Sequence, residues 1–362
     1  TQHGYATDVI TDEAIQWLDH RDNNKPFALH IHHKAPHRYF LAPLKYVKQF
    51  QHKIFEEPPT LYADMTQHGA AWQLQTMSIL KDLKLCSDLK VDPQYLADIP
   101  WLKPDAAEVA YYNSIMNRIP EPERTGLKEL FAERGKILQA QRPNGNELLK
   151  LKFQWYLRDY AACVASVDEN VGRVLDYLDA HGLTKNTMVV YTGDQGMYLG
   201  ENGWFDKRWM YDVSMQAPLL IRWPSITKAG SICEELTQTI DYAPTLLDAA
   251  NVPVPAFMQG VSLKPLLQNG KRRLGRTNLY YHFYEYHADH TVLPHLGIRG
   301  HRYKLIYFYT VNEWELYDLE KDPTEQHNLA GEKKYSKLVE EMKKSLLKER
   351  IKYQDTDKAG IL

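Results

Sequence analysis

The stretch MVVYTGDQG, residues 188–196, holds four apolar, strand-favouring residues that end abruptly at a polar turn between two glycines. Such a run, bounded by turn residues, predicts a short buried strand over 188–191. Immediately upstream, apolar side chains recur every three or four positions from Glu147 to Leu178, which predicts a long helix ending before Gly182. A helix, a short turn and a strand with polar residues at its carboxyl end form the α/β unit whose strand tips hold binding sites.

The residues that follow extend the α/β pattern. A second apolar strand over 219–222 stops at Pro224, which cannot continue a central strand. A helix is predicted over 242–250, with Asp241 as its N-cap. This order of elements places a second strand and its helix after the polar turn.

Towards the N-terminus the pattern predicts a helix over 7–18, with Thr11 as its N-cap and acidic residues in its first turn. A strand is predicted over 27–32, although its alternation of polar and apolar residues is imperfect. Residues 51–146 mix charged, apolar and Pro-bearing pieces, which we interpret as helices and loops.

The sequence changes character after residue 270, where tyrosine-rich segments become frequent. Strands are predicted over 278–284, 303–309 and 314–319. Leu338, Met342 and Leu346 are spaced to share one face of a closing amphipathic helix. We therefore expect a main domain over 1–270 and a smaller C-terminal subdomain over 271–362, built from antiparallel strands and one helix.

Composition excludes several classes of protein. Lys and Arg number 44 against 46 Asp and Glu, whereas a nucleic-acid binder should show a clear basic excess, so nucleic acid is not an expected partner. No stretch approaches the ~20 consecutive apolar residues that a membrane span needs. The three cysteines, Cys86, Cys163 and Cys233, lie far apart and lack the CxxC spacing of a zinc site.

The polar turn after the first strand carries a candidate metal site. Asp194 and Gln195 place a carboxylate beside an amide oxygen, and a hard cation such as Ca²⁺ prefers oxygen ligands of this kind. The alternative is a tight turn in which the aspartate binds its own backbone. Two ligands cannot complete a calcium site, so other ligands would have to come from elsewhere in the protein.

Two further positions could meet an anionic substrate. Lys207 offers a compact positive charge and Arg208 a planar fork, and both geometries suit an oxyanion. The alternative for Lys207 is an ordinary surface ion pair with Asp206. His37 follows an Ala-Pro pair, where a capping or packing role is the alternative to catalysis.

Taken together, these pieces resemble the type I sulfatases of the alkaline phosphatase-like superfamily. Residues 191–224, YTGDQGMYLGENGWFDKRWMYDVSMQAPLLIRWP, are similar to the metal-and-lysine segment of that family. Residues 25–43, KPFALHIHHKAPHRYFLAP, are similar to its histidine loop. Further stretches resemble family signatures at residues 159–160 with 166–172, 241–247, 259–263, and 315–319 with 322–323. The resemblance covers almost the whole chain and is weakest over 51–146.

The resemblance implies an α/β fold in which helices flank a mixed sheet, followed by a smaller C-terminal subdomain. It also implies hydrolysis of sulfate esters on sulfated carbohydrate, assisted by one Ca²⁺ and by a formylglycine nucleophile. Position by position, Asp194 and Gln195 match metal ligands, Lys207 matches the sulfate-binding lysine, and His37 matches the histidine near the leaving oxygen. Preorganised positive charge suits this chemistry, because negative charge spreads over the sulfate oxygens in the transition state.

Other positions complete the expected site. Lys34, Arg208 and His295 are the further candidates for substrate contact. Asn202 stands where many family members carry histidine, so its role does not follow from the resemblance. The resemblance also implies a periplasmic or secreted protein that depends on a separate enzyme to generate its formylglycine.

The nucleophile itself is not in this sequence. Formylglycine is made from Cys or Ser in a C/S-x-P/A-x-R motif, and no cysteine or serine here has that context. The family's early Asp-Asp metal pair is also absent, and both features precede a segment that corresponds here to residues 4–8. We therefore expect that roughly the first 150 residues of the domain lie outside this chain, which alone should not turn over substrate.

Two other functions remain open from the sequence. One is a phospho- or phosphonate-ester hydrolase of the same superfamily, and the other is a relative that binds sulfated glycans without cleaving them. The aromatic residues Tyr281, Phe283, Tyr284 and Tyr286 could line a sugar subsite, or could pack strand side chains against the main domain.

Overall fold

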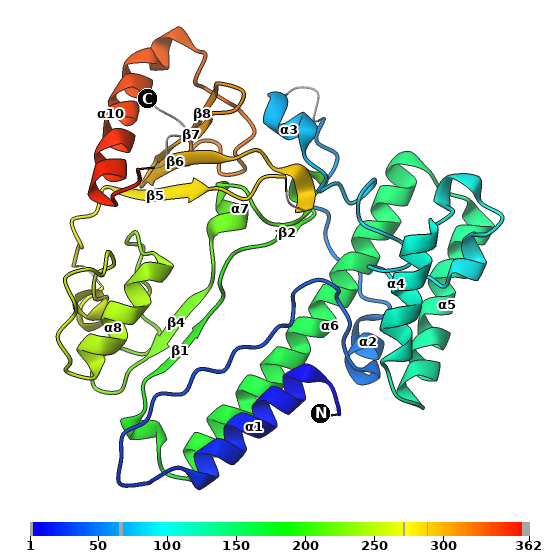
Figure 1. Ribbon diagram of the computed structural model, residues 1–362, viewed down its shortest axis with the longest axis horizontal. Coiled ribbons are helices and arrows are strands. Elements are labelled where there is room, and N and C mark those ends of the chain that lie inside the picture. Colours follow the sequence, from blue (N-terminus) through cyan, green and yellow to red (C-terminus); the bar gives the residue numbers. More distant parts are fainter. Residues whose placement is uncertain (1–2, 65–67, 271, 288, 357–362) are drawn as a thin grey trace. The chain divides into compact units, whose positions relative to one another are not determined.

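The computed structural model describes residues 3–64, 68–270, 272–287 and 289–356 (Figure 1). The chain forms two compact units that interleave along the sequence. The first comprises Thr1–Ala63, Met77–Lys185 and Leu199–Asp206, and the second comprises Asp64–Thr76, Asn186–Tyr198 and Lys207–Leu362. No helix within the described ranges is both long and apolar enough to cross a membrane.

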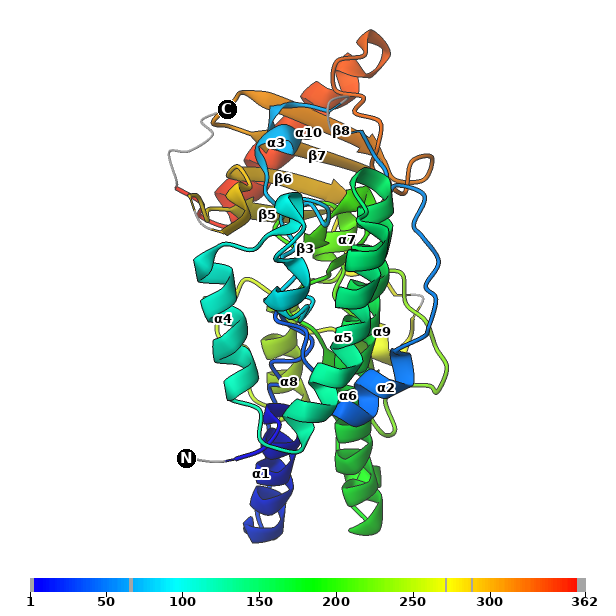
Figure 2. The ribbon, with the colours of Figure 1, turned by 90° about the vertical axis from the view of Figure 1, so that its right-hand side faces the viewer.

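The first unit is helical and is built around one long helix, α6 (Gly145–Ala180), seen in Figures 1 and 2. Six consecutive residues of this helix, 152–157, are buried, so neighbouring segments surround it there. Helices α1 and α2 pack along it. The other helices of the unit and its 3₁₀ turns are α1 (Ala6–His20), α2 (Leu44–Phe50), α4 (Ala106–Asn117), α5 (Glu123–Gln141), η2 (Pro93–Leu96), η3 (Pro100–Leu102) and η5 (Glu201–Gly203).

The long helix confirms the periodicity over Glu147 to Leu178, whereas two details near the N-terminus were wrong. Helix α1 begins at Ala6 after Tyr5, and Thr11 lies inside it, where its hydroxyl donates to the carbonyl of Thr7 at 3.1 Å. A threonine can satisfy its hydroxyl in this way within a helix, so it need not mark the start. Residues 27–32 form no strand among the described residues, because no neighbouring strand pairs with them.

The second unit contains an antiparallel sheet with the order β5-β6-β7-β8. Its strands are β5 (Asn278–Phe283), β6 (His295–Gly300), β7 (Tyr303–Phe308) and β8 (Glu313–Asp318). Helix α10 (Ser336–Lys352) covers one face, and Met342 and Leu346 pack against buried strand residues such as Leu305. The antiparallel strands and closing helix are thus confirmed, and strand β6 is an addition that the sequence pattern did not single out.

A second pair of strands carries the polar turn. Strands β1 (Val189–Thr192) and β4 (Leu219–Arg222) run antiparallel, with Thr192 opposite Leu219. The remaining elements within the described residues are η4 (Thr184–Asn186), β2 (Tyr198–Leu199), β3 (Phe205–Asp206), α3 (Ala70–Leu74), α7 (Asp212–Met215), η6 (Thr239–Asp241), α8 (Tyr242–Ala249), α9 (Lys264–Gln268), η7 (Asp289–Thr291) and η8 (Lys333–Tyr335).

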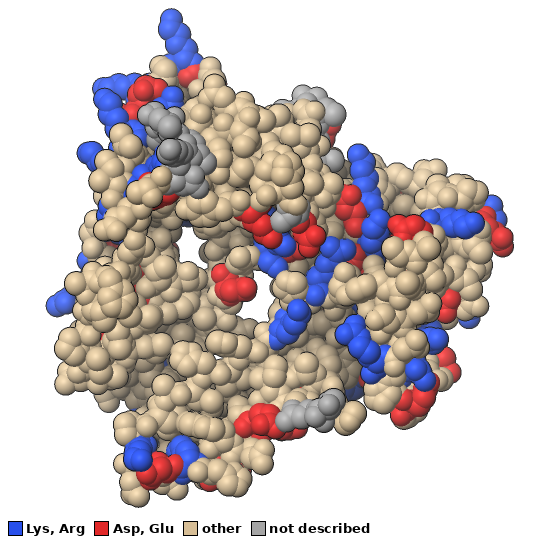
Figure 3. All heavy atoms as spheres, in the orientation of Figure 1, with Lys and Arg blue, Asp and Glu red and all other residues tan. Residues whose placement is uncertain are grey.

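Helix α8 begins where the sequence predicts, but Asp241 does not cap it with its side chain. The Asp241 carboxylate instead binds the Arg276 guanidinium through two hydrogen bonds of 2.8 Å. The α/β class with an antiparallel C-terminal sheet is confirmed, and within the described residues β1 and β4 form a two-stranded antiparallel pair. Figure 3 shows Lys and Arg interspersed with Asp and Glu around the α4–α5 region of the visible face, as the near-balanced composition predicts.

Candidate active site

The polar turn after β1 presents two oxygen-bearing side chains to solvent. Asp194 and Gln195 are both exposed, and neither side chain makes a hydrogen bond or ion pair within the described ranges. The alternative of an aspartate satisfied by its own turn therefore finds no support in the geometry. Unengaged carboxylate and amide oxygens are the chemistry that a hard cation requires.

The backbone of this turn is held at a fixed place by Gly196. Its amide donates to the carbonyl of Ser214 at 2.9 Å. A Cβ atom at position 196 would lie 2.0 Å from the carbonyl oxygen of Val213, so only glycine allows the turn to approach this segment. The two candidate ligands are thus carried by a turn that is packed directly against α7.

Ser214 also holds the candidate lysine segment. Its hydroxyl accepts a hydrogen bond of 3.0 Å from the backbone amide of Arg208, the residue after Lys207. One residue of α7 therefore connects the turn carrying Asp194 and Gln195 with the segment carrying Lys207 and Arg208. The structure brings these four sequence-predicted residues together within the second unit.

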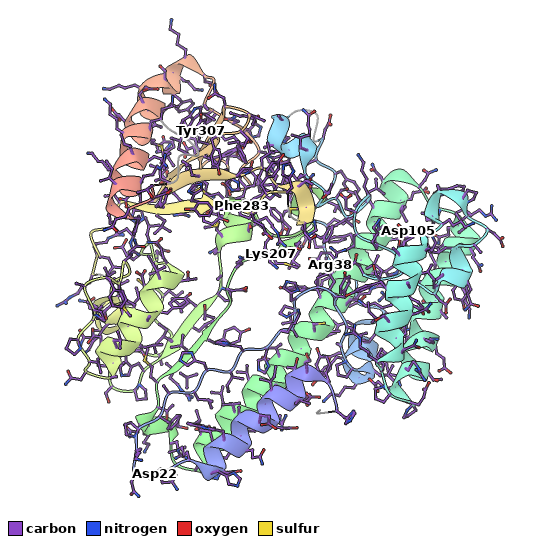
Figure 4. All side chains as sticks on the ribbon, in the orientation of Figure 1. Asp22, Arg38, Asp105, Lys207, Phe283 and Tyr307 are labelled. Carbon is purple, nitrogen blue, oxygen red and sulfur yellow. The ribbon has the colours of Figure 1, made fainter. Side chains whose placement is uncertain are left out.

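Lys207 and Arg208 differ in their surroundings. Lys207 is half-buried and extends from the chain just before α7, as Figure 4 shows. Arg208 has a positive φ of 123°, and its side chain is only 16% exposed. Its guanidinium lies 3.5 Å from the carboxylate of Glu285, so part of its charge is already engaged within the unit. Lys207 also has an interaction within the described residues, so neither of the two side chains is free of contacts.

His295, a candidate for substrate contact, lies in a closed aromatic cluster. The residue is fully buried, and its ring packs against Phe283, Phe308 and Trp209 at centroid distances of 5.3, 4.9 and 6.2 Å. Its Nδ1 donates to the carbonyl of Leu293 at 2.8 Å, and burial lowers the pKa of the ring to about 4. A neutral ring without solvent exposure is suited to packing, so the geometry does not support His295 as a substrate contact.

The first unit contains the candidate histidine turn. His37 is exposed, and its backbone amide donates to the carbonyl of Lys34 at 2.9 Å, which closes the turn. Its Nδ1 lies 2.8 Å from the carbonyl oxygen of Arg38. Because a carbonyl only accepts, Nδ1 must carry the proton, and Nε2 is the ring atom available to exchange a proton with a substrate. Lys34 is also exposed and lies on the same turn.

An ion pair anchors the turn that carries His37. The Arg38 guanidinium binds both oxygens of Asp88, at 2.6 and 2.8 Å, and also lies over the rings of Tyr39 and Phe205. The same carboxylate accepts from the backbone amide of Lys84 at 2.7 Å. A bidentate pair with aromatic stacking fixes the guanidinium more firmly than a single surface contact would.

Sequence reasoning missed four positioning residues. Ser214 and Gly196 lie within the decisive run, and a glycine directly after a ligand pair signals a close backbone approach. Arg38 lies beside His37, but nothing in the sequence links it to Asp88, which is 50 positions away. Asn202, at the position where the family often has histidine, is buried in the first unit, and its backbone amide donates to Thr60 Oγ1 at 3.0 Å.

The second unit can supply part of a divalent cation site. Asp194 and Gln195 offer two protein oxygens, and the described residues contain no group of three or more His, Cys, Asp or Glu side chains that could hold a metal. Ca²⁺ takes 6–8 oxygen ligands, so about four to six would have to come from other residues, substrate or water. The exposed oxygen atoms of Asp194 and Gln195 are suitable ligands for Ca²⁺, but two ligands are too few, so the site needs additional donors.

Comparison with protein families places the chain. Residues 1–252 match the family described as Sulfatase, and residues 200–352 match the family described as N-sulphoglucosamine sulphohydrolase, C-terminal. An N-acetylglucosamine-6-O-sulfatase of Bacteroides thetaiotaomicron is 43% identical over 359 residues, which cover 98% of this chain and 63% of that protein. An arylsulfatase of Clostridium perfringens is 26% identical over 95% of this chain and 58% of its own length. The chain therefore spans about three fifths of these relatives.

Solved structures agree with the family matches. A structure described as a complex with its substrate D-glucosamine-2-N,6-O-disulfate matches with a TM-score of 0.92 and 41% identity, covering the whole of this chain and 72% of that one. A phosphonate monoester hydrolase of Agrobacterium radiobacter matches with a TM-score of 0.65 at 22% identity, which shows a shared fold alone. The Sulfatase match covers well over half of the chain. This chain belongs to the sulfatase family of the alkaline phosphatase-like superfamily.

Proposed function

We propose that the protein to which this chain belongs hydrolyses a sulfate ester on a sulfated glycan, and that its substrate carries a 6-O-sulfated glucosamine residue. The observation that carries the proposal is the connection through Ser214, which holds the Asp194–Gln195 turn and the Lys207 segment together. The 43% identity to an N-acetylglucosamine-6-O-sulfatase supports the choice of sugar.

Asp194 and Gln195 would contribute two oxygens to a Ca²⁺ ion, which supplies positive charge for the sulfate oxygens when bound. Lys207 would add a compact positive charge for the same oxygens, which become more negative in the transition state. Lys34 and Arg208 are the further candidates for contact with the anionic substrate. None of these roles requires a proton to leave the lysine.

His37 would protonate the leaving oxygen of the sugar. Its Nδ1 is committed to the carbonyl of Arg38, so the proton would pass from Nε2. The nucleophile that the family resemblance implies, a formylglycine, would supply the attacking oxygen, and no residue of this sequence has the context for that modification. It would therefore come from a part of the protein outside this chain, after action of a maturation enzyme.

The remaining parts of the proposal follow from the family. We expect the catalytic domain to include residues 1–270, the C-terminal subdomain to comprise 271–362, and the whole protein to be periplasmic or secreted. A phosphonate-ester hydrolase is the alternative, but two structural relatives described as phosphonate monoester hydrolases are 22% and 20% identical and support the fold alone. A glycan-binding protein without catalysis is the second alternative.

The test uses the complete protein, expressed from the full coding sequence together with a formylglycine-generating enzyme. Sulfate release is measured from N-acetylglucosamine-6-sulfate and from glucosamine-2-N,6-O-disulfate, alongside a phosphonate monoester of the same leaving group. We expect release of the 6-sulfate and little turnover of the phosphonate. Preferred hydrolysis of the phosphonate would support the first alternative, and sugar binding without release would support the second.

A further inference from the structure

A large cavity lies in the second unit, beside strand β5 and the end of helix α10. Its volume is about 780 Å³, within the range of about 300–1,000 Å³ typical of small-molecule sites. Its wall is formed by tyrosines and neutral amides around one buried His–Asp pair. The lining residues are Gln238, Ile240, Gln259, Tyr280, His282, Tyr284, Tyr353, Gln354, Asp355 and Thr356.

Strand β5 separates this cavity from the aromatic cluster around His295. Side chains alternate between the two faces of a strand, so Tyr280 and His282 face the cavity while Tyr281 and Phe283 face the other way. The second pair contacts the ring of His295 at centroid distances of 5.8 and 5.3 Å. Of the aromatic residues singled out in the sequence, Tyr281 and Phe283 therefore pack, and Tyr284 lines the cavity.

A hydrogen-bond network fixes the floor of the cavity. Asp355 accepts from the hydroxyl of Tyr280 and from Nδ1 of His282, the second at 2.8 Å. Nε2 of His282 lies 3.4 Å from the hydroxyl of Tyr309. The side chains of His282 and Asp355 are only 2% and 7% exposed, so the network supports the wall rather than meeting a ligand. These donors bind the Asp355 carboxylate, so this network presents no exposed negative charge to the cavity.

The tyrosine rings above this floor are held in place and partly open to solvent. Tyr280 and Tyr353 stack nearly parallel, at 13° and 5.9 Å between centroids. The Tyr284 ring packs against His282 at 3.8 Å and is still 58% exposed. A rigid, exposed aromatic ring offers an apolar face at low entropic cost, which suits the C–H face of a sugar ring.

Neutral hydrogen-bonding groups surround these rings. The Gln259 amide donates to the Tyr353 carbonyl at 3.0 Å, and the Gln238 amide donates to the Tyr353 hydroxyl at 3.4 Å. The Gln238 side-chain oxygen also accepts from the backbone amide of Asp241. A side-chain amide has four hydrogen-bonding sites, so one contact at Gln259 and two at Gln238 leave capacity for a ligand. Gln354 is exposed at the same wall. Amides beside aromatic faces match the hydroxyl groups and C–H faces of a pyranose.

We propose that this cavity binds one or two pyranose rings of the glycan chain that carries the sulfate ester. The assignment of the ligand to that glycan rests on the proposed function. Neutral amides and stacked tyrosines favour the sugar rings themselves, whereas a site for a sulfate group would be expected to present unengaged Lys or Arg. The cavity would hold a polymeric substrate without taking part in the reaction.

The test compares Tyr284→Ala with Tyr284→Phe in the complete, matured protein. Two substrates are used, the monosaccharide N-acetylglucosamine-6-sulfate and a sulfated polymer that contains it. Tyr284→Ala should raise KM for the polymer about 5-fold and leave kcat unchanged, since loss of an aromatic contact weakens binding by about that factor. KM for the monosaccharide should not change. Tyr284→Phe keeps the ring and should behave as wild type on both substrates.

A direct binding measurement separates this proposal from the proposed function. Unsulfated N,N′-diacetylchitobiose is titrated calorimetrically into wild type, Tyr284→Ala, Gln354→Ala and the site variant Lys207→Ala. Binding that persists in Lys207→Ala but weakens in Tyr284→Ala and Gln354→Ala supports the cavity, whether or not sulfate is released. Equal affinity in all four proteins, or an unchanged polymer KM in Tyr284→Ala, would overturn it.

Discussion

Arg38 and Asp88 form a two-point ion pair that fixes the peptide bearing the hydrogen-bond acceptor of His37. Their two hydrogen bonds measure 2.6 and 2.8 Å, and the Asp88 side chain is completely buried. The carbonyl that receives the Nδ1 proton of His37 belongs to Arg38 itself. The ion pair between the two side chains therefore fixes the residue whose backbone carbonyl orients the proposed acid.

Asp88→Asn in the complete protein should slow hydrolysis because it replaces the charged acceptor of Arg38 while keeping its shape. We expect kcat to fall about 10-fold, which is a part of the roughly 10²–10⁴-fold that general acid catalysis contributes, because the acid is misoriented and not removed. The fall should be larger for aryl sulfates with poor leaving groups, which need the acid most. The control Asp12→Asn alters an exposed ion pair with Arg173 in the same unit. An equal loss across all leaving groups would indicate a structural effect only.

Gly196→Ala should displace the turn that carries the proposed metal ligands. The new Cβ would lie 2.0 Å from the carbonyl oxygen of Val213, a contact that only a backbone shift can relieve. We expect the calcium-dependent rise in the melting temperature of the complete protein to disappear, because ligand binding to the native state raises stability. Gly172→Ala is the matched control, since its Cβ meets nothing within 4 Å and the residue lies inside α6. Retention of the full calcium effect in Gly196→Ala would contradict this role for the turn.

Asp194→Ala tests the ligand assignment itself. Removal of a carboxylate from a hard-cation site should abolish calcium binding and activity in the complete protein. Calcium binding is measured by titration calorimetry, which does not depend on turnover. Asp22→Ala removes a different exposed carboxylate, paired with Lys25 in the first unit, and should leave binding unchanged. Full activity and unchanged calcium affinity in Asp194→Ala would show that the assignment is wrong.

The sequence predicted the parts of this molecule that depend on local pattern. The repeat along Glu147 to Leu178 predicts most of α6, and the apolar run before Asp194 predicts β1 to within one residue. Contacts between distant segments could not be predicted in this way. The Arg38–Asp88 pair is one such contact. The burial of His295 is a second example, because the sequence around a histidine in a strand does not show which distant residues will pack over it.

Lys207→Ala should reduce kcat about 10²–10³-fold in the complete protein, as loss of one oxyanion-stabilising group does elsewhere. The reason is electrostatic, since the lysine would offset charge that develops on the sulfate oxygens. Lys207→Arg should recover only part of the rate, because a planar fork does not reproduce a point charge. Single-turnover rates on N-acetylglucosamine-6-sulfate measure both variants. Complete rescue by arginine would contradict this role, because it would show that any positive charge at position 207 is sufficient.

Glu315 should make the stability of the second unit depend on pH. The carboxyl is fully buried and accepts a 2.6 Å hydrogen bond from the hydroxyl of Tyr211. Burial raises its pKa from 4.5 to about 8. A raised pKa means that the folded state holds the proton more tightly than the unfolded state does. This contribution to stability is therefore complete below pH 4.5 and is lost as the pH rises towards about 8.

Glu315→Gln removes this titration and keeps an amide oxygen that can accept from Tyr211. We expect the stability difference between wild type and the variant to shift in favour of Glu315→Gln by about 1.4 kcal/mol per pH unit across this range. Urea unfolding of the complete protein at several pH values measures the difference. Glu320→Gln, which changes an exposed carboxylate paired with Arg302, should show no such trend. A pH-independent difference between wild type and Glu315→Gln would mean that Glu315 is already ionised in the folded protein.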